Sequence, residues 1–117
     1  MDEQSRRVNL NHPWEHASDS IEVKSDGSFV AELFDFSGNR GGDEAWGVTV
    51  AKEFQQQLLD SLRQDEIFQN QFTSGSPVEQ LIQLLPLFVE RFPNYHSFKS
   101  WLTESGVPFT NWHDNMA

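Results

Sequence analysis

The densest run of apolar positions in the chain lies within residues 76–92. Ser76 is a favoured N-cap, and Pro77 suits the first position of a helix because its missing N–H has no partner there anyway. Apolar residues then recur at helical spacing: Val78, Leu81, Ile82, Leu85, Phe88, Val89 and Phe92, with Leu84 and Leu87 widening the stripe. The pattern predicts a helix that is buried on most sides and forms the hydrophobic centre. Pro86 lies inside this helix and should kink it.

Alternation in residues 20–36 predicts a hairpin that turns at Ser25-Asp26-Gly27. A two-residue Asp-Gly loop would place apolar Ile21 opposite Glu32. A three-residue loop with Gly27 in the left-handed region instead pairs Val23 with Phe29 and separates apolar from polar faces. We therefore expect the three-residue loop and a positive φ at Gly27. Further strands are predicted at residues 7–11 and 45–50.

Phe34 and Phe36 continue the hairpin on the face that carries Val30 and Glu32. That face is polar near the turn and apolar at its far end. The two phenylalanines are either covered by a later segment or exposed as a contact patch. We expect covering, because exposed aromatic clusters are uncommon on monomers.

Helical spacing returns after residue 50. One helix is predicted over residues 51–63, and another should begin at an Asn94 cap and end at Gly106, a left-handed C-cap. The aromatic tail, residues 109–114, is expected to dock on the sheet. Strands followed by helices predict a single α+β domain over residues 1–117. Its antiparallel sheet should have three to four strands from the N-terminal half, packed against three or so C-terminal helices.

Charge narrows the choice of partners. The chain carries 18 acidic and 8 basic residues, a formal net charge of -10, spread over both halves. Such a surface has too few cations to bind nucleic acid phosphates or anionic lipid. It attracts a basic protein and speeds that encounter, although the same charge could serve only solubility.

Motifs for chemistry are sparse. His12-Pro13-Trp14-Glu15-His16 matches the H-x-x-E-H string of inverted zinc peptidases. That motif needs both imidazoles on one helical face, and Pro13 is tolerated only in the first turn, so we expect solvated histidines and no metal site. The glycine-rich segment 37–44 lacks the Lys-Ser or Lys-Thr of a phosphate-binding loop, and no cofactor is predicted. The absence of Cys fits a cytoplasmic protein. No apolar run approaches the ~20 residues of a membrane span.

These observations favour a small acidic protein-binding module that covers a basic surface of a partner protein, as inhibitors and immunity-type proteins do. The expected contact comprises the 37–44 loop and its flanks: Phe34, Phe36, Arg40, Asp43, Glu44 and Trp46. One alternative is a small enzyme or ligand carrier with an aromatic-lined pocket that uses His12, His16, His96 or His113 as acid–base groups. Another is a homo-oligomeric structural subunit. No catalytic motif supports the enzyme, so no catalytic residue is predicted.

Overall fold

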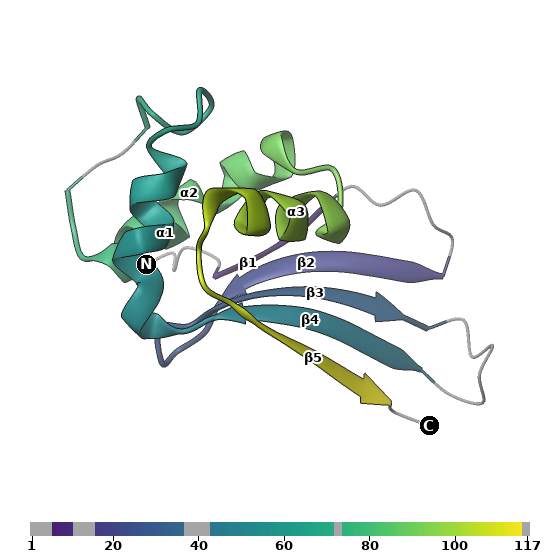
Figure 1. Cartoon of the computed structure of the whole chain (residues 1–117). Helices are drawn as coiled ribbons and strands as arrows, with labels where there is room; N and C mark the ends of the chain where they lie inside the picture. The colour runs from purple at the N-terminus through teal and green to yellow at the C-terminus, as the bar shows by residue number, and fades with distance from the viewer. Residues whose placement is uncertain (1–5, 11–15, 37–42, 72–73, 116–117) are drawn as a thin grey trace, which may run out of the picture.

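The computed structural model describes residues 6–10, 16–36, 43–71 and 74–115. In this part of the chain, an antiparallel sheet of five strands carries three α-helices on one face (Figure 1). The strands lie side by side in the order β1-β2-β3-β4-β5. The elements are β1 (Arg7–Asn9), β2 (Ala17–Val23), β3 (Phe29–Asp35), β4 (Glu44–Val50), a 3-10 turn (Lys52–Phe54), α1 (Gln55–Leu62), α2 (Pro77–Arg91), α3 (Tyr95–Ser105) and β5 (Thr110–Asn115).

The α+β class is confirmed, but the sheet has one strand more than the upper expected number. The aromatic tail docks as β5, which pairs with the edge of β4 from Thr49↔Thr110 to Glu44↔Asn115. Edge pairing satisfies the backbone groups of β4. It also means that the tail extends the sheet sideways and does not lie across a face.

The hairpin has the predicted register. Val23 pairs with Phe29 and Ile21 with Ala31, and the amide of Lys24 donates to the carbonyl of Ser28 at 2.8 Å to close the three-residue loop. Gly27 has φ +92°, as expected for the residue that turns the chain back. Hydrogen bonds from the hydroxyl and the amide of Ser28 lower the pKa of Asp26 in this turn.

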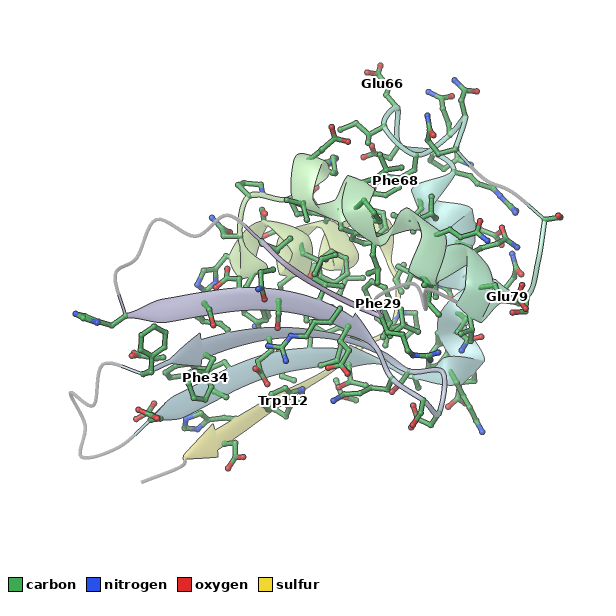
Figure 2. All side chains as sticks on the ribbon, turned by 180° about the vertical axis from the view of Figure 1, so that it is seen from behind. Phe29, Phe34, Glu66, Phe68, Glu79 and Trp112 are labelled. Atoms are coloured by element: carbon green, nitrogen blue, oxygen red, sulfur yellow. The ribbon has the colours of Figure 1, made fainter. Side chains whose placement is uncertain are left out.

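Alternation divides the sheet into two faces. The covered face lies under the helices and buries apolar side chains: Ile21, Val23, Phe29, Ala31, Leu33, Val48 and Val50. The open face carries the residues between them, among them Ser20, Glu22, Val30, Glu32, Phe34 and Thr49. No helix of the described chain lies over the open face, as the views from both sides show (Figures 1 and 2).

The core forms between the covered face and α2. Ser76 caps α2 by accepting a hydrogen bond from the amide of Glu79 at 3.2 Å, and Pro86 lies inside the helix without ending it. Leu85 and Phe88 are buried, and Phe88 contacts Phe29 of β3 with a ring-centroid distance of 5.2 Å. The prediction that this helix is the hydrophobic centre is therefore confirmed. None of the described helices is long and apolar enough to cross a membrane.

Asp19 fixes α3 to the sheet. This side chain is fully buried on β2, and its carboxylate accepts a hydrogen bond from the amide of Tyr95 in the first turn of α3. Asn94 and Ser97 form a capping box at the same end, and Gly106 ends the helix with φ +74°, as predicted. A buried carboxylate at a helix N-terminus is stabilised by the unpaired amides and the helix dipole.

Candidate functional site

The strand ends farthest from the hairpin turn extend beyond the helices (Figures 1 and 2). We call them the distal end of the sheet: the start of β2, the end of β3, the start of β4 and the end of β5, together with His16 and Phe36. Phe34, Phe36, Asp43, Glu44 and Trp46, all predicted as contact residues, lie here. Arg40 lies outside the described residues.

An aromatic cluster occupies the open face at the distal end. Phe34 and Phe36 stack with ring centroids 6.2 Å apart, and His16 meets Phe36 edge-on, also at 6.2 Å. The amide of Phe36 donates to the carbonyl of His16 at 2.8 Å, which holds the two residues side by side. Phe36 is 45% exposed and Phe34 is half-buried, so the expectation that a later segment covers both is wrong for Phe36.

Trp46 lies on the covered face, opposite the aromatic cluster. Its ring stacks on His113 of β5 with centroids 5.1 Å apart and planes at 15°. His113 Nε2 lies 3.3 Å from Glu44 Oε2, and Glu44 is only 6% exposed. The register explains the separation, because Trp46 pairs with Leu33 whereas Phe34 pairs with Ala45. The predicted contact residues therefore share one end of the sheet but divide between its two faces.

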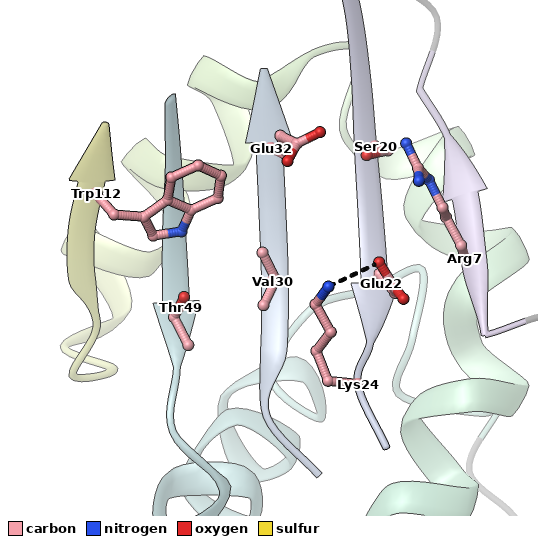
Figure 3. A pocket seen from close by; sticks show the side chains of 8 residues that line it. All are labelled: Arg7, Ser20, Glu22, Lys24, Val30, Glu32, Thr49 and Trp112. Carbon is pink, nitrogen blue, oxygen red and sulfur yellow. Dashed lines mark ion pairs between the residues drawn. The ribbon is translucent and has the colours of Figure 1, made fainter. Parts of the chain in front are cut away.

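A groove of about 340 Å³ lies on the open face (Figure 3). Its lining residue Glu32 is two positions before Phe34 on the same face of β3. Side chains from all five strands or their ends line the groove: Arg7, Ser20, Glu22, Lys24, Val30, Glu32, Thr49 and Trp112. Lys24 Nζ forms an ion pair with Glu22 Oε1 at 3.4 Å. None of these residues was predicted as a contact. The sequence of residues 110–115 contains no alternation of apolar and polar positions, so nothing in it assigns Trp112 to a face of the sheet.

Gly47 gives Trp112 its position in the groove. A Cβ atom added at Gly47 would lie 2.1 Å from Cζ2 of Trp112 and 2.6 Å from Nε1. Only a residue without a side chain lets the indole lie this close to the strand. Trp112 thus lies flat across β4, with one ring face on the backbone of Gly47 (Figure 3).

The structure keeps the described histidines apart from one another. His16 and His113 lie on opposite faces of the sheet, and His12 is outside the described residues. His96 is exposed on α3. Among the described residues, no group of three His, Asp or Glu side chains could hold a metal ion. Aromatic rings, carboxylates and hydroxyls on an uncovered sheet face can instead stack on and hydrogen-bond a partner.

The chain matches no known protein family, no curated protein and no solved structure. The functional argument therefore depends on the residues of the distal end and the open face alone.

Proposed function

We propose that this chain is a small acidic binding protein that inhibits a partner protein by covering a basic surface of it. Its contact surface is the open face, from the groove to the aromatic cluster. The cytoplasm is its proposed compartment, which the absence of Cys suits.

The observation that carries the proposal is Phe36, uncovered beside Phe34 on a sheet face without a helix. A large aromatic side chain gains stability by burial, and leaving it in water forgoes that gain. Aromatic residues are enriched at the energetic centres of protein interfaces, where surrounding polar groups exclude water. The aromatic cluster shares its end of the sheet with the carboxylates of Asp43 and Asp114.

Charge supports a basic partner. Asp43 and Asp114 lie at the distal end, and the described residues of these strand ends include no Lys or Arg. The net charge of -10 adds a long-range attraction for cations. Attraction of this kind raises the association rate and is screened by salt over about 10 Å at 0.1 M.

The first test isolates the partner by co-purification from the native cells, followed by identification and purification. Binding is then measured with Phe36→Ser, and Ile67→Ser serves as a matched control because Ile67 is 37% exposed on another part of the fold. We expect Phe36→Ser to weaken affinity at least about tenfold, because interface hot spots cost about 2 kcal/mol or more on truncation and ~1.4 kcal/mol is a tenfold loss. Equal affinities of the two variants would refute the proposed contact.

A second test addresses charge. Asp114→Lys should slow association and reduce its salt dependence, whereas Glu104→Lys on α3 should change it little. Glu44 is unsuitable for reversal because it is buried, so a loss of binding there would reflect misfolding. If the association rate does not change with salt concentration, the acidic surface does not steer binding and serves only solubility. Light scattering of the isolated chain measures its molar mass in solution, and a mass above that of one chain would support the homo-oligomer alternative.

A further inference from the structure

The open-face groove combines a flat aromatic surface with a carboxylate. Trp112, Gly47 and Glu32 occupy one row across β5, β4 and β3, because Gly47 pairs with both of the others. Adjacent strands lie about 4.8 Å apart, so an indole that extends from β5 across β4 brings its far edge toward Glu32. Figure 3 shows the ring and the carboxylate on the same side of the sheet.

The indole offers one ring face to the groove. Its other face lies on Gly47, where an added Cβ would fall within 2.6 Å of three ring atoms. The backbone of β4 therefore fixes the orientation of the ring before any ligand arrives. An aromatic ring held in this way attracts a cation over its face, and Trp is the strongest of the aromatic residues in this respect.

Glu32 differs from the other carboxylate of the groove. Glu22 is paired with Lys24, whereas Glu32 is half-buried and has no hydrogen bond or ion pair with any described residue. A partly desolvated carboxylate is stabilised by a cation that donates hydrogen bonds to it. The hydroxyls of Ser20 and Thr49 lie on strands to either side of β3 and can accept further hydrogen bonds.

We propose that this groove binds the guanidinium group of an arginine side chain on the partner protein. The inference rests on the proposed function and names the chemistry of its central contact. A guanidinium is planar, so it can stack on Trp112 while its N–H groups donate in pairs to Glu32. The compact ammonium of lysine can also approach a ring and a carboxylate, but it has no flat face to stack and no pair of parallel N–H groups to match Glu32. Arg7 and Lys24 line the β1–β2 side, so the arginine enters from the β4–β5 side.

The test uses a small probe in place of the partner. N-acetyl-arginine methylamide is titrated into the ¹⁵N-labelled chain while the Trp112 indole N–H signal is followed. That signal is identified among the four tryptophans by its loss in Trp112→Leu. The control probe is the citrulline analogue, which has nearly the same shape without the charge. We expect saturation with arginine at a dissociation constant on the order of 1–10 mM, and little or no shift with citrulline.

Glu32→Gln should lower the affinity for the arginine probe at least about tenfold, the difference expected for losing a charged hydrogen-bond acceptor. Glu104→Gln, an exposed change on α3, should leave it unaffected. Equal shifts with arginine and citrulline, no saturation, or a Glu32→Gln chain that binds as the wild type would each overturn the inference. Saturation by methyl glucoside but not by arginine would also overturn it, in favour of a sugar site. The comparison of probes on the wild-type chain decides even where a variant fails to fold.

The probe result and the partner result are independent. If Phe36→Ser lowers the affinity for the partner while the arginine probe does not bind, the proposed function stands and the groove inference fails. If the probe binds as expected while Phe36→Ser leaves partner affinity unchanged, the guanidinium site in the groove stands, and the aromatic cluster is removed from the proposed contact surface.

Discussion

Gly47→Ala is the substitution that should disturb the open face most directly. The new methyl would lie 2.1 Å from Cζ2 and 2.2 Å from Cε2 of Trp112. Carbon atoms in contact normally stay about 3.5–4.0 Å apart, so the indole must leave its position across β4. Because Trp112 is half-buried near the surface, its side chain can turn outward while the strand pairing persists.

The cost of Gly47→Ala can be estimated from the area that the indole loses. A tryptophan buries roughly 150–250 Å², and turning this half-buried ring outward exposes about 100 Å² of it. At about 25 cal/mol per Å², that exposure costs about 2.5 kcal/mol. Alanine in a strand recovers about 0.5–1 kcal/mol relative to glycine. The expected net loss in the free energy of unfolding is therefore about 1.5–2 kcal/mol.

A double-mutant cycle measured by urea unfolding tests whether Gly47→Ala destabilises by displacing Trp112 or because β4 tolerates no side chain at this position. In a Trp112→Ala background there is no ring to displace, so Gly47→Ala should be neutral or stabilising by up to about 1 kcal/mol. The indole N–H signal should shift in Gly47→Ala alone. The same destabilisation in both backgrounds, or none in the wild type, would refute the assigned position of Trp112.

Three further predictions concern the fold. Leu85→Ala should lower the free energy of unfolding by about 2–5 kcal/mol because Leu85 is buried in the core, and a loss below about half a kcal/mol in urea unfolding would show α2 to be peripheral. Asp19→Ala removes the acceptor of the buried Tyr95 amide and should cost about 1–3 kcal/mol, with faster amide exchange at the start of α3; unchanged exchange would contradict this role. Burial, and secondarily the charge of Asp19, raise the pKa of Tyr95, the only tyrosine. The unfolded chain therefore loses this proton first, and stability should fall as pH rises above about 10. Tyr95→Phe should remove that decline, and an unaltered decline in denaturant unfolding would assign it to other groups.

Local features of the fold could be predicted from sequence because their determinants are close together in the chain. The cap at Ser76 and the apolar spacing after it specify α2 within a few turns. The hairpin register follows from the requirement that Val23 and Phe29 face the same side, and from the φ that Gly27 permits. In each case, one segment contains both the signal and the partners that it needs.

The candidate site depends on pairings between distant segments, which the sequence does not specify. Trp112 contacts Gly47 only because β5 returns to pair with β4 after three intervening helices. The same pairing places His113 beside Glu44. Glu44, which was expected at an acidic contact surface, is therefore buried. Alternation within 45–50 put Trp46 on one face of its strand. Whether Trp46 and Phe34 share a face depends on how β3 pairs with β4, and the sequence of the connection between them does not specify that register.

The order of the elements explains how an uncovered face and a high negative charge belong together. All three helices are inserted between β4 and β5, and all pack on one side, so nothing in the described chain remains to cover the other side. An open sheet face with Phe34, Phe36 and Trp112 would favour association between copies of the chain. A net charge of -10 opposes that association, because two copies repel each other before their aromatic surfaces meet. Under the proposed function, the same charge would attract a basic partner, so it would favour that partner over a second copy of the chain as the occupant of this surface.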